Sequence, residues 1–188
     1  GYRGMDIRFA SNNTVMGNNI YANSSHGMYL SAGTNNTLIG NNVCSNTNSG
    51  ILLQSSPQSI LIGNNTYSNG DPGINIDSSD NNIVTGNNVY SNVDVGFYLY
   101  FADNNTLTRN KSYSNLSHGF YIYTNTNNIL TENDTYSNGN DGIYFTYTAP
   151  NNNNALIGNR TYSNSNYGVR LYDSAGINVA AGNLGYDS

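Results

Sequence analysis

One unit of about 23 residues recurs along the chain, and this recurrence limits the fold more than any other feature. The clearest copy runs from Gly86 to Thr108. Its first position recurs at Gly17, Gly40, Gly63, Arg109, Glu132 and Gly158. The intervals between these positions are equal, except for the last, which is longer. The extra residues fall in the stretch 149–154, which we expect to form a longer loop at one corner of the unit.

Each unit carries three short segments with the spacing of β-strands. Phe97 and Leu99 flank Tyr98, so apolar residues sit two apart, which is the strand period. The same pair recurs at Met28 and Leu30, Ile51 and Leu53, Ile74 and Ile76, Phe120 and Ile122, Ile143 and Phe145, and Val169 and Leu171. A glycine precedes every pair, which indicates a positive φ or a close backbone approach. A second segment carries one apolar residue, at Leu38, Leu61, Val84, Leu107, Leu130, Leu156 and Val179.

A unit this short cannot close a hydrophobic core alone. Stacked on copies of itself at the strand spacing of about 4.8 Å, it buries a continuous column of like side chains. The repeat therefore predicts an all-β fold, a right-handed single-stranded parallel β-helix (β-solenoid). We expect about seven to eight coils, each of roughly 23 residues with three short strands, forming a single rod over residues 1–188.

Asparagine makes up about a fifth of the chain and recurs at fixed positions. A side-chain amide has donors and an acceptor, so stacked asparagines can bond to one another and to the turn backbone. We expect two structural Asn ladders. They comprise Asn18, Asn41, Asn64, Asn87, Asn110, Asn133 and Asn159, and Asn23, Asn46, Asn69, Asn92, Asn115, Asn138 and Asn164.

The repeat pattern N-x-[IVT]-x-x-N-x-x-x-G-[IFM]-x-[LI]-x-x-[SA]-x-N-N-x-[IL], as in Asn87 to Leu107, resembles the parallel β-helix repeat of NosD-like proteins. This carbohydrate-binding and sugar-hydrolase repeat group belongs with pectate lyases and mannuronan epimerases, and its long arrays are common in archaeal and bacterial surface proteins. The resemblance implies an extracellular or cell-surface location. It does not fix a function, since the same repeat hosts lyases, epimerases, hydrolases and inert stalks.

Composition limits the partners. Only 9% of residues are charged and the net charge is −5, which disfavours nucleic acid as a partner. No apolar run is long enough to cross a bilayer as a helix, so we expect no membrane span. Both ends of the sequence fall within a coil, which indicates a piece of a longer repeat protein. Its partners would be other copies of itself, neighbouring coils of a parent protein, or a polysaccharide.

Tyrosines gather at two positions of the repeat. We expect an exposed platform on the strand that follows the glycine, suited to a sugar or a protein partner. Its binding residues would be Tyr29, Tyr98, Tyr100, Tyr121, Tyr123 and Tyr144. A second column runs from Tyr21 to Tyr162; its Thr and Ser neighbours favour an inward orientation, whereas Ile20, Val43 and Val89 favour the opposite one. We expect the inward orientation, which would place this column in the core.

No group of residues has the composition of a catalytic centre. Asp71 and Asp94 occupy equivalent positions about 5 Å apart in adjacent coils, where Ca²⁺ binding is the alternative to a solvated turn. His26 and His118 lie four coils apart, roughly 19 Å, too far to act together. Arg170 lies next to no stacked aspartate, and the epimerase-like signature Y-G-F-D-P-H is incomplete. We expect no other cofactor.

Two functions follow. The first is a non-catalytic structural module of a secreted or cell-surface protein such as an envelope, sheath, fibre or stalk, which self-assembles through its coil ends or its tyrosine-rich face. The alternative is a β-helix that binds or modifies a polysaccharide as a lyase, epimerase or hydrolase. The absence of a catalytic cluster in the sequence favours the first.

Overall fold

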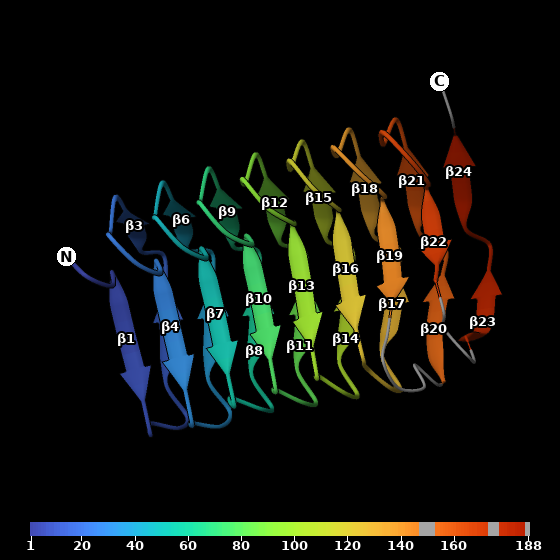
Figure 1. The fold of residues 1–188 in the computed structure, drawn as a ribbon. Helices are drawn as coiled ribbons and strands as arrows, with labels where there is room; N and C mark the ends of the chain where they lie inside the picture. The colour runs from blue at the N-terminus through green and yellow to red at the C-terminus, as the bar shows by residue number, and fades with distance from the viewer. Residues whose placement is uncertain (147–152, 173–176, 187–188) are drawn as a thin grey trace.

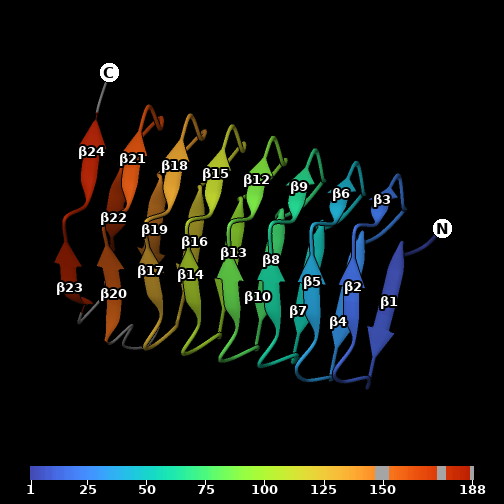
Figure 2. The ribbon, with the colours of Figure 1, turned by 180° about the vertical axis from the view of Figure 1, so that it is seen from behind.

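The computed structural model describes residues 1–146, 153–172 and 177–186 of the chain. In these ranges twenty-four strands form three parallel sheets of eight strands each, and each sheet takes every third strand of the chain. The chain winds around a single axis, with sheet A on one side and sheets B and C on the other (Figure 1, Figure 2). No helix long and apolar enough to cross a membrane occurs in the described part of the chain.

The strands fall into three sets. Sheet A contains β1 (Met5–Arg8), β4 (Met28–Ser31), β7 (Ile51–Gln54), β10 (Ile74–Asp77), β13 (Phe97–Tyr100), β16 (Phe120–Tyr123), β19 (Ile143–Thr146) and β22 (Val169–Leu171). Sheet B contains β2 (Thr14–Met16), β5 (Thr37–Ile39), β8 (Ile60–Ile62), β11 (Ile83–Thr85), β14 (Thr106–Thr108), β17 (Ile129–Thr131), β20 (Asn154–Ile157) and β23 (Ile177–Ala181). Sheet C contains β3 (Asn19–Tyr21), β6 (Asn42–Cys44), β9 (Asn65–Tyr67), β12 (Asn88–Tyr90), β15 (Lys111–Tyr113), β18 (Asp134–Tyr136), β21 (Arg160–Tyr162) and β24 (Leu184–Tyr186).

The register follows the sequence repeat. Phe97 pairs with Ile74 on one side and Phe120 on the other, so like positions stack along the rod. The predicted all-β, three-strand coil is confirmed. The insertion interrupts this register only locally, with an irregularity between Asn154 and Ala155 in the pairing of β20 with β23. Of the predicted corner loop, residues 149–152 lie outside the described residues.

The core is a column of stacked apolar side chains. Both members of the repeating pair point inward, and Phe97 and Leu99 are fully buried. The rings of Phe97 and Phe120 stack with centroids 4.5 Å apart. Leu107 of sheet B is also fully buried. At the last strand of sheet A, Leu171 is exposed, because no further strand of the described chain covers it.

The glycine before each apolar pair is required for close approach. A Cβ at Gly96 would lie 2.0 Å from Ser112 Oγ and 2.7 Å from the carbonyl oxygen of Gly119. A different column, at the corner between sheets B and C, holds the glycines with positive φ, including Gly86 at 64°. Arg109 and Glu132 occupy this second column with φ of 53° each.

Both predicted Asn ladders are present, and all their members except Asn18 and Asn164 are buried. Asn64 Nδ2 donates to Asn87 Oδ1 at 3.0 Å and to the Leu38 carbonyl at 3.0 Å, while Asn64 Oδ1 accepts from Asn41 N and Nδ2 at 3.0 and 2.9 Å. A third ladder, not predicted, follows sheet A at the opposite corner; Asn82 Nδ2 donates to Asn105 Oδ1 at 2.9 Å. Its buried members are Asn36, Ser59, Asn82, Asn105, Asn128 and Asn154.

The predicted inward orientation of the Tyr21-to-Tyr162 column is wrong. The middle residue of each sheet C strand from β3 to β21 points inward, and Val43, Thr66 and Ser112 are fully buried. The tyrosines stack outside the rod with neighbouring ring centroids 4.8 to 4.9 Å apart, from Tyr67 through Tyr90, Tyr113 and Tyr136 to Tyr162. Small hydroxyl residues fit inside because they lie against the glycine corner, where Ser112 Oγ donates to the Gly119 carbonyl at 2.7 Å.

Candidate functional site

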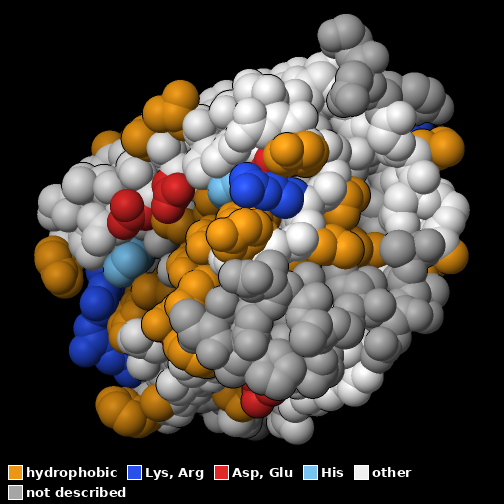
Figure 3. Space-filling model, turned by 45° about the vertical axis from the view of Figure 1, so that its right-hand side comes forward, with side chains coloured by type: hydrophobic (Ala, Val, Ile, Leu, Met, Phe, Trp, Pro, Cys, Tyr) orange, Lys and Arg blue, Asp and Glu red, His pale blue; other side chains and the backbone are white. Residues whose placement is uncertain are grey.

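The outer face of sheet A carries two adjoining columns of tyrosines. In the first column the rings of Tyr98, Tyr121 and Tyr144 stack with centroids 5.1 and 5.3 Å apart. In the second column Tyr100 and Tyr123 stack at 5.4 Å. The two columns are inclined to each other, since the ring planes of Tyr121 and Tyr123 form an angle of 79°. A ligand on this tyrosine platform, defined by these five residues, would contact ring edges and phenolic hydroxyls. Hydrophobic side chains, the class that includes tyrosine, gather on this side of the molecule (Figure 3).

Tyr29 does not belong to this exposed surface, so that part of the prediction is wrong. It is only 8% exposed, because the Arg3 guanidinium covers its ring at 3.9 Å from the centroid. Its hydroxyl donates to Gln54 Oε1 at 2.5 Å. Leu52 and Asn75 separate it from Tyr98 in the same column.

Burial raises the pKa of the Tyr98 hydroxyl, and the neighbouring Tyr121 adds to the effect. Burial also raises the pKa of Tyr121, with Tyr144 as the next cause. Both hydroxyls therefore stay protonated at neutral pH. Each can donate one hydrogen bond and accept others, as a sugar hydroxyl requires.

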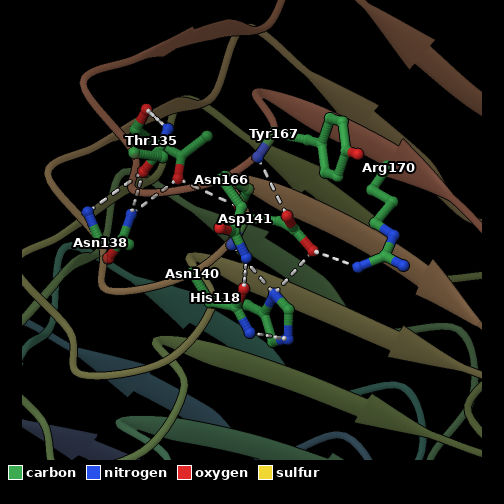
Figure 4. Close-up of polar contacts among 10 residues, drawn as sticks. His118, Thr135, Asn138, Asn140, Asp141, Asn166, Tyr167 and Arg170 are labelled. Carbon is green, nitrogen blue, oxygen red and sulfur yellow. Dashed lines mark hydrogen bonds and ion pairs between the residues drawn. The ribbon is translucent and has the colours of Figure 1, made fainter.

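At the C-terminal end of this platform, His118, Asp141 and Arg170 from three successive coils meet (Figure 4). The Asp141 side chain is fully buried, and its Oδ1 accepts a hydrogen bond from the Tyr167 backbone N–H at 3.0 Å. Its Oδ2 lies 3.3 Å from His118 Nδ1 and 4.0 Å from Arg170 Nη1. Among the described residues no hydrogen bond reaches this oxygen. The buried carboxylate therefore faces both basic groups.

His118 precedes the glycine corner before β16, and this position brings its ring against the platform. The ring stacks on Tyr144 with centroids 4.7 Å apart, and its Nε2 lies 3.1 Å from Asn140 Nδ2. Burial lowers the pKa of His118, Asp141 opposes this effect, and Arg170 adds to it. The imidazole is therefore neutral at neutral pH.

The tautomer of His118 decides what the ring can do. With the ring proton on Nε2, Nδ1 accepts a hydrogen bond from the Asp141 backbone N–H at 3.2 Å. A proton on Nδ1 would give up that bond, but it would satisfy the otherwise unbonded Oδ2 at 3.3 Å and leave Nε2, the nitrogen at the Asn140 side, as a proton acceptor. In that form the Asp141–His118 pair has the geometry of a carboxylate that orients a general base.

Arg170 lies on β22 between aromatic rings. Its guanidinium carbon is 5.3 Å from the Tyr144 ring centroid, 5.4 Å from that of Tyr167 and 5.3 Å from that of Tyr172. These contacts hold the cation at the surface, where its side chain is 37% exposed. A planar guanidinium in this position can pair with a carboxylate of a ligand.

The expectation that no stacked aspartate lies next to Arg170 missed Asp141 of the preceding coil, which approaches it from another column. Asp141 occupies the position before the glycine, whereas Arg170 occupies the position two residues after it, so the two residues belong to different columns of the repeat. Equivalent positions of the repeat stack directly on one another, whereas Asp141 and Arg170 contact each other across two columns. Diagonal neighbours lie within reach of a long side chain.

Asp71 and Asp94 lie farther along the same face. Burial raises the pKa of Asp94, and the charge of Asp71 raises it further. Within the described ranges, no three His, Cys, Asp or Glu side chains form a group that could hold a metal ion. The ring of His26 stacks on that of Tyr29 with centroids 5.8 Å apart. His26 lies four coils away from His118.

The outer face of sheet A therefore combines a tyrosine platform, an accessible cation and a neutral imidazole oriented by a buried carboxylate. Such a surface can bind hydroxylated anionic ligands and can accept a proton at His118 Nε2.

Comparison with solved structures shows a shared fold. The periplasmic alginate epimerase AlgG superposes with a TM-score of 0.88 at 22% identity, covering 99% of this chain and 47% of that one. The A-module of the Azotobacter vinelandii mannuronan C-5 epimerase AlgE6 gives 0.86 at 19% identity, covering 98% and 54%. The pectate lyase Pel9A gives 0.59 at 14% identity, covering 92% and 56%. This chain thus spans about half the length of these proteins.

The sequence has no match among curated proteins. It does match the family model described as the right handed beta helix region, over residues 1–65 and 33–184. Together these two segments cover residues 1–184, almost the entire chain. The chain belongs to the right-handed β-helix family.

Proposed function

We propose that this chain binds an acidic polysaccharide on the outer face of sheet A, with Arg170 pairing a carboxylate of the sugar chain. The observation that carries the proposal is the placement of Arg170 at the end of the tyrosine platform, 5.3 Å from the Tyr144 ring centroid. The similar folds of two epimerases, one of alginate and one of mannuronan, and of a pectate lyase support the choice of ligand.

The platform suits such a ligand because its rings and hydroxyls lie along the rod axis. A linear polysaccharide aligned with this axis would place successive sugar hydroxyls beside successive tyrosine hydroxyls, since like positions repeat every coil. Charge alone would not hold it, because the chain carries a net charge of −5. The local cation at Arg170 therefore selects the site.

Binding of polygalacturonate, alginate and neutral cellulose oligosaccharides to immobilised protein tests the proposal. We expect the two acidic ligands to bind and the neutral one to bind more weakly. Arg170→Gln and Tyr123→Ala should each weaken binding of the acidic ligands about tenfold, the loss expected for one good charged or aromatic contact. Tyr113→Ala, on the outer face of sheet C, is the matched control and should bind as wild type does.

Equal binding by all four proteins, or none by wild type, would reject the proposal. The structural role would then be favoured: a stiff, non-catalytic module of a secreted or surface protein. In either case we infer a location outside the cytoplasm, as for the periplasmic AlgG, and a single rod that forms part of a longer protein.

A second candidate function is proton transfer on the bound sugar, favoured by the 3.3 Å contact between His118 Nδ1 and Asp141 Oδ2. Neutral His118 would accept, at Nε2, the proton on the sugar carbon next to the carboxylate. The electron pair left on that carbon would spread into the carboxylate, whose growing charge Arg170 would stabilise. Return of a proton from the other face would invert the carbon; loss of the glycosidic oxygen on the adjacent carbon would cleave the chain.

Incubation of the polysaccharide in D₂O tests this second function, because both outcomes begin with breakage of the C–H bond. We expect deuterium at the carbon next to the carboxylate, or an unsaturated chain end, with wild type. His118→Gln should abolish both signals while retaining binding. Binding without either signal in wild type would restrict the chain to a binding role.

A further inference from the structure

The positive charges of this chain are few and concentrated. Of its six Lys and Arg residues, Arg109, Lys111 and Arg160 line one surface depression, together with Glu132, Asp134 and Gly158. The depression encloses about 330 Å³. In a chain with 9% charged residues, five charged side chains around one depression are a strong departure from the background.

The depression lies at the corner between sheets B and C, over the turns from β14 to β15, β17 to β18 and β20 to β21. This corner is on the side of the rod away from the outer face of sheet A (Figure 1, Figure 2). It is therefore separate from the tyrosine platform and from Arg170. A ligand held here would leave the first site accessible.

Two ion pairs organise the depression. Arg109 Nε donates to Glu132 Oε2 at 2.6 Å. Arg160 Nε and Nη2 donate to the two carboxylate oxygens of Asp134 at 2.6 and 2.8 Å. Both carboxylates are thus neutralised by an arginine, and the local sum of three positive and two negative charges is +1.

The remaining positive charge belongs to Lys111. Its ammonium makes no hydrogen bond or ion pair to any residue that the structure describes, although it lies beside Asp134 in the strand pairing. Among the described residues, Arg109 forms its side-chain hydrogen bond through Nε alone. Its side chain is 72% exposed, so its terminal amino groups are accessible. These donors face the depression and suit an anionic oxygen group.

At this corner two charged residues replace the glycine found in the other coils. Six equivalent corner positions hold glycine with positive φ, whereas Arg109 and Glu132 hold the same conformation at 53°. A left-handed backbone disfavours such side chains by about 1 kcal/mol or more, and an exposed ion pair recovers little of this. At these glycines a side chain would project into open space, as the empty surroundings of Gly86 show. The two residues thus place charge at the surface at a cost in stability.

We propose that this corner depression is a second site for an anionic sugar group, a carboxylate or a sulfate ester, held by Lys111 and Arg109. This inference rests on the function proposed for sheet A. Together the two sites, on opposite sides of the rod, make the rod bivalent. A bivalent rod cross-links chains of an acidic polysaccharide. This activity would combine carbohydrate binding with a structural role in a matrix or envelope.

A sandwich assay tests cross-linking. Polygalacturonate is immobilised, wild-type monomer is bound to it, and capture of a second, labelled polygalacturonate is measured; labelled heparin in a parallel arm distinguishes sulfate from carboxylate. We expect capture by wild type. Lys111→Asn, which restores the asparagine of the preceding sheet C strands, should bind the first layer normally and capture the second about tenfold less.

Arg8→Ser removes one positive charge elsewhere and should capture as wild type does, which controls for net charge. Arg109→Gly, which restores the corner glycine, should fold at least as well as wild type and lose capture like Lys111→Asn. Unchanged capture by both corner variants would overturn the proposal.

A direct titration keeps this proposal separable from the function proposed for sheet A. A uronic acid tetrasaccharide is added to ¹⁵N-labelled Arg170→Gln protein, and the backbone resonances of Lys111 and Gly158 are followed. We expect them to shift even though the sheet A site is impaired. If they do not move with the tetrasaccharide or with a sulfated equivalent, the second site does not exist, whatever sheet A binds.

Discussion

His118 Nδ1 lies 3.3 Å from Oδ2 of the buried Asp141 carboxylate, one coil further along the rod. Neither residue has a counterpart of the same type at its position in the adjoining coils. Their contact depends on the stacking of coils, and it converts two unremarkable residues into an oriented pair. Burial lowers the pKa of His118 and this contact opposes the effect, so burial sets the charge state of the imidazole.

The pH dependence of stability reports on this pair. Burial holds the pKa of His118 below its usual 6.5, so below about pH 6.5 the unfolded chain binds a proton that the folded chain does not. Stability should therefore fall as the pH drops from 7 to 5. The melting temperature of His118→Gln should fall less over this range, since His26 titrates equally in both proteins. Parallel curves would show that His118 is not buried as described.

The inward position of Leu107 is tested by a charge. Leu107 is fully buried, so Leu107→Asp would place an unpaired carboxylate in the core and should destabilise the rod by several kcal/mol or unfold it. Thr108→Asp, at the adjoining outward position of β14, is the control and should change stability little. Chemical denaturation followed by circular dichroism measures both. Similar unfolding midpoints for the two variants would contradict the assigned face.

The Asn ladder contributes to stability through buried hydrogen bonds. Asn110 Nδ2 donates to the Val84 carbonyl at 2.8 Å and to Asn133 Oδ1 at 3.0 Å, and its Oδ1 accepts from Asn87. Asn110→Ala leaves these buried groups unpaired and should cost about 1–3 kcal/mol or more. Asn88→Ala, in the half-exposed outer row of sheet C, should cost distinctly less. Equal losses in urea denaturation would contradict the role given to the buried ladder.

Asp71 and Asp94, in the turns before β10 and β13, are expected to be unfavourable neighbours. Burial and the charge of Asp71 both raise the pKa of Asp94, so Asp94→Asn should leave stability at neutral pH unchanged or slightly higher. Asp71→Asn combined with Asp94→Asn should not alter the effect of Ca²⁺ on the melting temperature. A Ca²⁺-induced rise in wild type that disappears in the double variant would establish a calcium site.

Much of the fold was predictable because the signal is repeated. The spacing of Phe97 and Leu99 marks an inward face by itself, and its recurrence in every coil removes ambiguity about register. The Asn ladders were predictable for the same reason. The orientation of the sheet C strands was not, because Tyr113 is amphipathic and its buried neighbour Ser112 is polar. The buried hydroxyl of Ser112 is explained only by the glycine corner facing it.

The candidate site was only half predictable. Five tyrosines of the platform follow from their positions in the repeat, but Tyr29 is covered by Arg3, which lies outside the tyrosine column. His118 and Asp141 each precede a corner glycine, 23 residues apart, so a comparison of like positions could have paired them. The contact of Asp141 with Arg170 joins different positions of neighbouring coils, and only the side-chain directions in the folded coil reveal it.

The most direct test of the central proposal is nuclear magnetic resonance of the isotopically labelled rod titrated with a uronic acid oligosaccharide. We predict that, on sheet A, the largest changes occur at Tyr121, Tyr144 and Arg170, and that they diminish in Arg170→Gln. Saturable changes confined to this end of the platform would support an acidic polysaccharide site. A titration that leaves all resonances of sheet A unchanged would contradict it.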